Sequence, residues 1–262
     1  MAHNGNGIKK VQGQSGDATE IKQRGLSYAF RVGMAVAVKY PSWGYFHFDL
    51  HAGSGYNEEA KCIGSPLAFL SEARRVNCTT YFAGFCDRDH DQIKSLLNRP
   101  EIDHDRCRLF HGDNAALLRM VPDIIRLYGK KNNVIGSVLS DPNGADVPID
   151  ELAWLARECP KIDIILHWNS TIVKRLRGGI RPDQISLTDA IRRIAKSSWL
   201  IREPVGIHQF TMLIGRNFRF GDWKSMGFYF LDSPKGQDIL QRCALPKHEI
   251  LRGKPPDQEA FL

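Results

Sequence analysis

The sequence has 262 residues, of which 42% are hydrophobic and 25% charged, proportions that are typical of a globular protein with a substantial core. No apolar run approaches the ~18 residues needed to cross a bilayer, which excludes a membrane-spanning protein, so we expect no membrane partner. Residues 1–25 are polar and glycine-rich without the apolar segment of a secretory signal. We therefore expect a flexible tail over 1–25 and a cytoplasmic protein.

The six cysteines have no metal-binding pattern. None forms a CxxC pair or another spacing that is typical of zinc sites. Scattered thiols are common in cytoplasmic proteins, where they stay reduced. We therefore expect reduced thiols and no metal cofactor.

The net charge of +7 is concentrated in the last third of the sequence. Residues 1–170 contain 20 Lys and Arg against 20 Asp and Glu, whereas residues 171–262 contain 16 against 9. This asymmetry favours a polyanion-binding surface in the second region. A solvated basic face without a partner is the alternative.

The predicted elements begin with a helix over residues 26–40, which Pro41 ends. Apolar strands and amphipathic helices then alternate along the chain. Strands are predicted at 45–51, 79–87, 107–113, 134–141 and 162–169, and helices at 65–77, 90–98, 115–129 and 147–159. This alternation indicates right-handed βαβ crossovers and a parallel sheet with helices on both faces.

The later part of the chain predicts an antiparallel edge. Its expected elements are a helix at 186–197, strands at 197–205, 208–217 and 228–232, and a helix at 235–243. The first two of these strands are only a few residues apart, so they must pair as a hairpin. No linker is evident, and we expect one α/β domain over 26–262: a doubly wound, mostly parallel, seven-stranded sheet with an antiparallel edge hairpin.

Four carboxylates fall where four consecutive predicted strands end: Asp49, Asp87, Asp113 and Asp141. In a doubly wound sheet, ligands bind outside the carboxyl ends of the strands. A carboxylate near a buried strand end costs free energy unless something pairs with it. Four such residues at one edge therefore predict a ligand site.

The first of these strand ends leads into a glycine turn, 49-DLHAGSG-55. Gly53 and Gly55 let the backbone take positive φ and approach a ligand without a Cβ in the way. The turn is not a Walker A loop, since no Gly-Lys-Ser/Thr follows, and it is not a GxGxxG motif, because Glu58 occupies the third glycine position. It is either a cofactor turn or a structural joint between strand and helix.

Asp87 and the pair Asp113–Asn114 follow the next two strands. A carboxylate at the position of Asp87 can accept hydrogen bonds from ribose hydroxyls, with a surface acidic turn as the alternative. A calcium loop is excluded there, because Gln92 occupies the required glycine position. Asp113 and Asn114 suit either hydrogen bonding to a purine edge or capping of the next helix.

The fourth strand end is 138-VLSDPNG-144. Pro142 fixes φ and donates no hydrogen bond, which leaves carbonyls free to point into the cleft. Together with Asp141, such a carbonyl offers two acceptors to an exocyclic amino group, and Asn143 is a further candidate. An ordinary β-turn is the alternative for this stretch.

These four stretches together resemble the Rossmann-like S-adenosylmethionine-dependent methyltransferases, over roughly residues 26–217. The resemblance implies S-adenosyl-L-methionine as cofactor and an antiparallel strand hairpin at the sheet edge. The implied cofactor-binding residues are Asp49, His51, Gly53 and Gly55 at the methionine end, Asp87 at the ribose, and Asp113 and Asn114 at the adenine. For His51, a structural role within the turn is the alternative.

The stretch SDPNG resembles the [DNS]-P-P-[YFW] signature of amino-methyltransferases that act on adenine N6 or cytosine N4. It implies Asp141, Pro142 and Asn143 as catalytic residues and adenine N6 in DNA as the target. Asn143 replaces the second proline, and Gly144 replaces the aromatic residue that stacks on a flipped base. Trp168, near the end of a predicted strand, is the best-placed substitute, with a core role as the alternative.

Two narrower likenesses add detail. The turn with His51 is similar to that of an rRNA adenine methyltransferase family. The turn, the stretch GSPL at 64–67 and the strand FTMLIGRN also resemble the three-Cys-motif partner proteins, which occur in bacterial mobile and defence-type gene neighbourhoods.

The basic region supplies candidate phosphate contacts, with DNA favoured over RNA as the partner. They are Lys174, Arg175, Arg177, Arg181, Arg192 and Arg193. No target-recognition domain is evident, so a protein partner that recognises the target sequence is also plausible. Two alternatives stay open. One is an RNA methyltransferase, and the other is a non-catalytic nucleic-acid-binding protein on the same scaffold, which would agree with the absence of the aromatic residue at Gly144. A dehydrogenase is disfavoured by the missing third glycine.

Overall fold

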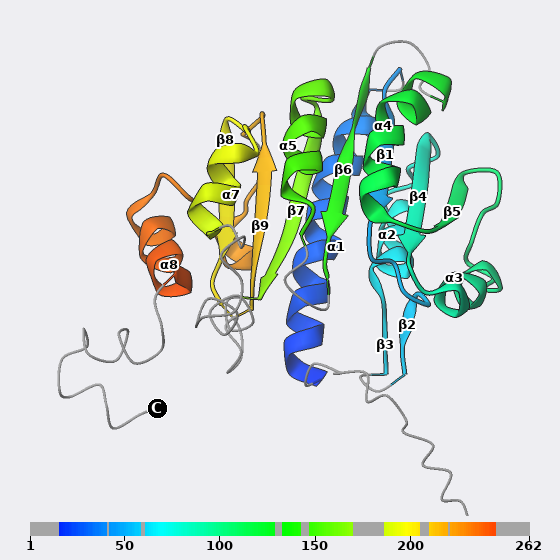
Figure 1. The fold of residues 1–262 in the computed structure, drawn as a ribbon, viewed down its shortest axis with the longest axis horizontal. Helices are drawn as coiled ribbons and strands as arrows, with labels where there is room; N and C mark the ends of the chain where they lie inside the picture. The colour runs from blue at the N-terminus through cyan, green and yellow to red at the C-terminus, as the bar shows by residue number, and fades with distance from the viewer. Residues whose placement is uncertain are drawn as a thin grey trace, which may run out of the picture.

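A computed structural model describes residues 16–40, 42–58, 61–128, 133–142, 147–169, 186–204, 210–219 and 221–244. Within these ranges an eight-stranded sheet lies between two layers of helices (Figure 1). The predicted α/β class and its mostly parallel sheet are confirmed.

Five strands form the parallel part of the sheet, in the order β5, β4, β1, β6, β7. Their bounds are Cys107–His111 (β5), Tyr81–Asp87 (β4), Gly44–Asp49 (β1), Val134–Ser140 (β6) and Ile162–Asn169 (β7). The four inner strands are largely buried apolar runs, as parallel strands covered by helices generally are, whereas the edge strand β5 is partly exposed. Their carboxyl ends meet at one edge, which brings the predicted site residues to the same side.

The predicted hairpin is present, and an additional strand lies beyond it. β9 (Phe210–Arg216) pairs antiparallel with β7, and β8 (Ser198–Arg202) pairs antiparallel with β9. The outermost strand is β10 (Phe228–Phe230), antiparallel to β8. The sheet therefore has eight strands, one more than the expected seven-stranded sheet, because the strand predicted at 228–232 joins the same sheet next to β8.

The helices divide into two layers, each with its own apolar core. One layer holds α1 (Gly16–Lys39), α2 (Ser65–Arg75) and α3 (His90–Leu97). The other holds α4 (Asn114–Tyr128), α5 (Ile149–Glu158), α7 (Leu187–Arg193) and α8 (Pro234–Ala244). Between β1 and α2, the glycine turn carries the small hairpin of β2 (Tyr56–Asn57) and β3 (Cys62–Ile63).

The first helix is longer than the sequence predicted, and residues 16–25 are helical, not a flexible tail. The Ile21 carbonyl accepts a hydrogen bond of 2.6 Å from Arg202 of β8, and Lys22 forms an ion pair with Asp141. The tail was predicted because residues 1–25 are polar. These two contacts with distant parts of the sheet hold residues 16–25 in the helix despite that composition. Residues 1–15 lie outside the described ranges.

A buried histidine makes the fold sensitive to acid. His47 is fully buried in β1, its ring stacks on Phe69 at 4.5 Å, and Nδ1 lies 2.9 Å from Ser137 Oγ. Burial lowers the pKa of His47 to about 3, so the folded protein keeps it neutral. Since an unfolded histidine titrates near ~6.5, its stabilising contribution is complete above that pH and is lost as the pH falls towards 3.

We expect the free energy of unfolding to fall more steeply below pH 6.5 in the wild type than in His47→Phe, which cannot take up that proton. Urea unfolding at several pH values between 7 and 5 measures this difference. The control is His90→Phe, since the His90 side chain is 68% exposed. Equal pH dependence in the wild type and His47→Phe would contradict the prediction.

Candidate active site

The glycine turn after β1 contains two residues with left-handed backbone. Gly53 has φ of +59° and Gly55 has φ of +76°. A Cβ at Gly53 would meet only Gln92 Oε1, at 3.9 Å, whereas one at Gly55 would lie 2.7 Å from Leu96 Cδ1. Gly55 is therefore required by packing, and Gly53 borders open space next to the strand ends.

Asp87, the last residue of β4, binds this turn directly. One carboxylate oxygen accepts a hydrogen bond of 2.9 Å from the Gly53 N–H, and the other accepts one of 2.9 Å from the Asp89 N–H. Each carboxylate oxygen can accept two bonds, so Asp87 keeps acceptor capacity for a diol. The structure thus joins two predicted cofactor residues, Asp87 and Gly53, in one contact.

Asp49, the last residue of β1, is fully buried with one oxygen unpartnered. Its Oδ1 accepts a hydrogen bond of 3.0 Å from the His51 N–H, and Oδ2 has no hydrogen-bond partner among the described residues. Burial raises the pKa of Asp49 to about 7, against the opposing effects of Ser65 and the His51 N–H. A buried carboxylate oxygen without a partner is a position at which a ligand's donor or cationic group can bind.

His51 connects three strand ends through its ring. Nδ1 accepts a hydrogen bond of 3.2 Å from the Asp141 N–H, and Nε2 lies 3.0 Å from the side-chain amide of Asn114. Burial lowers the pKa of His51, which favours the neutral ring. Because Nδ1 accepts the Asp141 N–H, the neutral ring carries its proton on Nε2, and the Asn114 amide, whose Nδ2 lies at 3.0 Å, must turn its oxygen to this side to accept it. His51 and Asn114 therefore bind each other within the site.

Asp113 lies further out than the other three carboxylates. Its side chain is 53% exposed, and Oδ1 accepts a hydrogen bond of 2.9 Å from Arg88 Nη2. This bond lowers the pKa of Asp113. The pair forms an exposed rim at the ends of β4 and β5, next to the glycine turn.

Asp141 follows β6 and is held by two side chains that the sequence did not predict. Oδ1 lies 2.6 Å from His167 Nδ1, and Oδ2 accepts a bond from Lys22 Nζ. The side chains of Lys22 and Asp141 are only 16% and 15% exposed. Burial alone would raise the pKa of Asp141, but Lys22 and His167 outweigh it and hold this pKa below its ordinary value. Asp141 is therefore an ionised carboxylate in a mostly buried position.

Lys22 and His167 were missed for different reasons. Lys22 lies in the segment that was predicted to be a flexible tail, and no local pattern pairs it with a residue 119 positions away. His167 left a usable signal, because it is a polar residue that follows the apolar run 164-IIL-166 near the end of the strand. Alternation along that strand places it opposite its neighbour Trp168, on the sheet face that α1 covers.

Trp168 does not provide an exposed aromatic face, so the prediction that it stacks on a base is wrong. Its side chain is 4% exposed and belongs to the core under α4, α5 and α7. Successive residues of a strand point to opposite faces, and His167 takes the face towards Asp141. Trp168 therefore points into the other helix layer.

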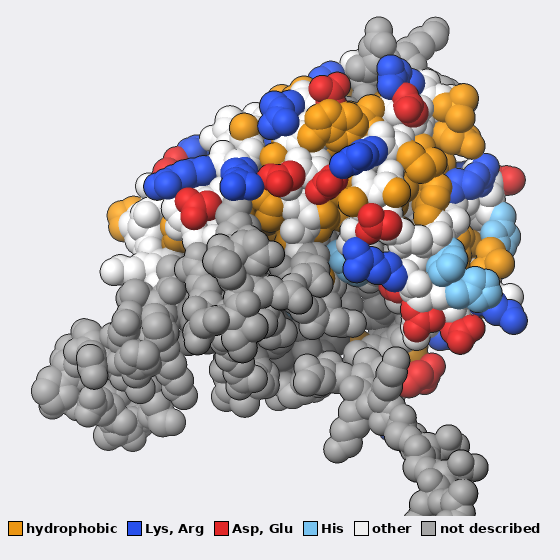
Figure 2. Space-filling model, viewed as in Figure 1, with side chains coloured by type: hydrophobic (Ala, Val, Ile, Leu, Met, Phe, Trp, Pro, Cys, Tyr) orange, Lys and Arg blue, Asp and Glu red, His pale blue; other side chains and the backbone are white. Residues whose placement is uncertain are grey.

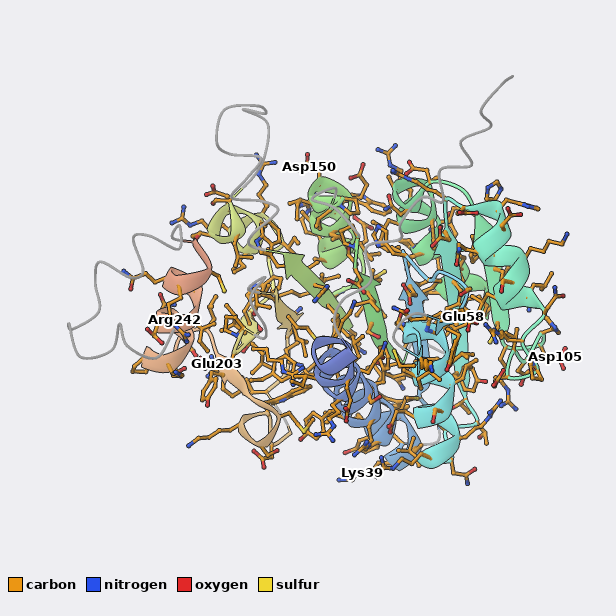
Figure 3. All side chains as sticks on the ribbon, turned by 90° about the horizontal axis from the view of Figure 1, so that it is seen from below. Lys39, Glu58, Asp105, Asp150, Glu203 and Arg242 are labelled. Carbon is orange, nitrogen blue, oxygen red and sulfur yellow. The ribbon has the colours of Figure 1, made fainter. Side chains whose placement is uncertain are left out.

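The described part of the basic region carries mainly paired charges. Arg192 lies 3.5 Å from Asp189, and Arg193 lies 2.9 Å from Asp150. Arg242 binds Glu203 at 2.6 Å, and Figure 3 labels these two residues close to each other. On the face shown in Figure 2, acidic and basic side chains are interspersed. The other predicted residues, Asn143, Lys174, Arg175, Arg177 and Arg181, lie outside the described ranges. The polyanion surface stays a prediction.

No protein-family model matches the chain, and no curated protein matches it. Several solved structures align with the chain. Protein LPL1258 from Legionella pneumophila aligns with a TM-score of 0.53 at 11% identity, covering 78% of this chain and 88% of its own. Human methyltransferase-like protein 13, in complex with SAH, aligns with a TM-score of 0.45 at 10% identity, covering 93% and 96%. A SAM-dependent methyltransferase from Agrobacterium tumefaciens aligns with a TM-score of 0.43 at 11% identity, covering 77% and 62%.

Similarity at such low identity concerns the fold. The antiparallel hairpin of β8 and β9 beside β7 agrees with the edge hairpin that the resemblance implied. The chain thus has a doubly wound, mostly parallel α/β fold with an antiparallel edge. Among the described residues, no helix is long and apolar enough to cross a membrane, and no cluster of three His, Cys, Asp or Glu side chains is arranged to hold a metal ion.

The two glycines of the turn should differ in their effect on stability. Gly53→Ala is expected to cost about 1–2 kcal/mol of unfolding free energy, the penalty for a Cβ in left-handed backbone. Gly55→Ala adds the collision with Leu96 and should cost about 3 kcal/mol or more. Urea unfolding of both variants measures the difference, and equal losses would contradict the distinct roles.

Proposed function

We propose that this protein is an S-adenosylmethionine-dependent methyltransferase that acts on an amino group of a nucleic-acid base, with adenine N6 in DNA as the first choice. The observation that carries the proposal is the contact at Asp141. This ionised carboxylate lies at the carboxyl end of β6 and already holds an amine, the Nζ of Lys22. A position that binds one amine nitrogen is chemically suited to bind another.

The cofactor assignment rests on the strand ends around the glycine turn. The unpartnered Oδ2 of Asp49 suits the ammonium group of the methionine end, and the open side of Gly53 leaves room for the ligand backbone. Asp87 is assigned to the ribose hydroxyls and Asp113 to the adenine. Asn114 is assigned to His51 instead of the adenine, because the two side chains bind each other. The bound cofactor would supply an electrophilic methyl group on sulfur.

The chain's own contribution to transfer is positioning. Asp141 and the Pro142 carbonyl would accept N–H bonds from the target amine, and Asn143 is a third candidate. Two such bonds orient the nitrogen lone pair, and orientation supplies a large share of rate enhancement. His167 is a positioning residue, since its bond to Oδ1 fixes the Asp141 carboxylate. No strong base is needed, because the proton can leave after transfer.

The nucleic-acid partner is proposed from the basic region, chiefly Lys174, Arg175, Arg177 and Arg181. Arg192 and Arg193 contribute less, because each already has a carboxylate partner. RNA is the alternative polyanion, and a further protein for target recognition stays compatible with this assignment. The burial of Trp168 favours a second candidate, a non-catalytic nucleic-acid-binding protein on the same scaffold, since that ring is closed to a flipped base.

Cofactor binding can be tested alone. We expect the wild type to bind S-adenosylmethionine with a Kd of roughly micromolar order, and Gly53→Ala to bind at least about tenfold more weakly because its Cβ enters the open side of the turn. Isothermal titration calorimetry measures both. Asp232→Asn is a matched control on the exposed surface. Absence of heat in the wild type at high micromolar ligand would refute the methyltransferase assignment.

Methyl transfer tests the acceptor site. With tritiated S-adenosylmethionine, we expect transfer to duplex DNA above transfer to total RNA. Asp141→Ala should lower the rate by about 100-fold or more with cofactor affinity nearly unchanged, because it removes the side-chain acceptor for the target amine. Asp232→Ala, on the exposed surface, is the matched control. Cofactor binding without transfer to either nucleic acid would support the non-catalytic candidate.

A further inference from the structure

Lys22 and Asp141 form a contact between the start of the chain and the end of a central strand. Lys22 lies in the first turns of α1, which in Figure 1 extend past the edge of the sheet where β6 ends. Its ammonium reaches Asp141 Oδ2 across 119 residues of sequence, and both side chains are mostly buried. A lysine in this position fills the side of Asp141 that a ligand would need.

The two oxygens of Asp141 have partners of different mobility. Oδ1 is held by His167 of β7, a strand in parallel register with β6 up to Ser140 and Leu166. That partner is fixed by the sheet. Oδ2 is held by the four-carbon side chain of Lys22, which has many rotamers. Of the two partners, Lys22 is the exchangeable one.

The helix that carries Lys22 is itself anchored. Arg202 of β8 is 9% exposed and donates a hydrogen bond of 2.6 Å to the Ile21 carbonyl, one residue before Lys22. Gly25 faces the same guanidinium, since a Cβ there would lie 2.5 Å from Arg202 Nη1. The backbone near Lys22 is therefore fixed to the sheet, and displacement from Asp141 requires only a rotation of the lysine side chain.

We propose that Lys22 is a resident ammonium that closes the acceptor site, occupying at Asp141 Oδ2 the place that the target amine takes when it displaces Lys22. This inference rests on the proposed function. An ammonium nitrogen has no lone pair, so Lys22 occupies this place without accepting a methyl group. Asp49, His51, Cys62 and His167 are the other titratable groups on which the charge of Lys22 acts.

The displaced contact also gives selectivity. Once Lys22 has left, Asp141 is a buried carboxylate with an open oxygen, which is costly unless the ligand supplies a donor. An amino group supplies N–H donors, whereas a carbonyl at the same ring position supplies none. The site therefore favours adenine or cytosine over hypoxanthine or uracil, because only the amino-bearing bases restore the bond.

A cofactor-free experiment tests whether the place at Oδ2 is exchangeable. Lys22→Ala leaves a space beside Asp141, and ethylammonium chloride is the probe for it. We expect ethylammonium to raise the Tm of Lys22→Ala by several degrees more than it raises that of Arg24→Ala, whose side chain is 69% exposed on the same helix. The double variant Lys22→Ala/Asp141→Asn should lose this effect. Equal shifts in all three variants would overturn the proposal.

A transfer experiment gives the direction of the effect. We expect Lys22→Ala to methylate nucleic acid with a KM about tenfold lower than the wild type, because no resident amine competes. Ethylammonium should then inhibit the variant competitively. If Lys22→Ala is inactive and ethylammonium restores activity, Lys22 belongs to the reacting machinery and the proposal is wrong. A methyl group on Lys22, detected by peptide mass spectrometry, would also overturn it.

These outcomes separate the two proposals. If the wild type binds no S-adenosylmethionine or transfers no methyl group, the proposed function fails. The ethylammonium shift still decides whether Asp141 has an exchangeable amine position. If transfer occurs but Lys22→Ala leaves KM unchanged, the proposed function stands and the resident ammonium is refuted.

Discussion

Two carboxylates lie near one lysine at the carboxyl edge of the sheet, but only Asp141 bonds to it, and the chemistry of the site depends on this imbalance. Lys22 bonds to Asp141 and, with His167, keeps the pKa of that residue below its ordinary value. Among the described residues Asp49 has no hydrogen-bonded cation, and burial raises its pKa to about 7. A buried carboxylate without a cation is costly, so the site has a place for one more cationic group.

The sheet brings these groups together through simple alternation. Asp49 ends β1, Asp141 follows β6 and His167 lies near the end of β7, and all three take the face that α1 covers. The antiparallel strands contribute as well, since β8 supplies Arg202, which holds α1 in place. Helix and sheet edge therefore form one unit, in which the fold positions both Asp141 and the ammonium that bonds to it.

Local pattern was sufficient to predict most of the fold and to place the candidate site at the carboxyl edge of the sheet. Apolar runs marked the strands, and an acid after each of four runs marked the edge, because burial and strand direction follow from short stretches of sequence. Lys22 could not be predicted as a site residue, since its place there depends on a contact with Asp141 that no local pattern encodes. Trp168 was misassigned because the preceding run 164-IIL-166 is continuously apolar, which hides the alternation that separates Trp168 from His167.

The burial of Trp168 changes how the proposed site would choose its target. Without that ring, stacking on a flipped base is weaker as a source of selectivity, and Gly144 has no side chain to replace it. Displacement of an ammonium from a buried carboxylate provides another source. A ligand with N–H donors restores the lost bond, and one with a carbonyl leaves Asp141 unpaired at a cost of several kcal/mol. In this proposal Oδ2 of Asp141 both orients the amine and rejects bases that lack one.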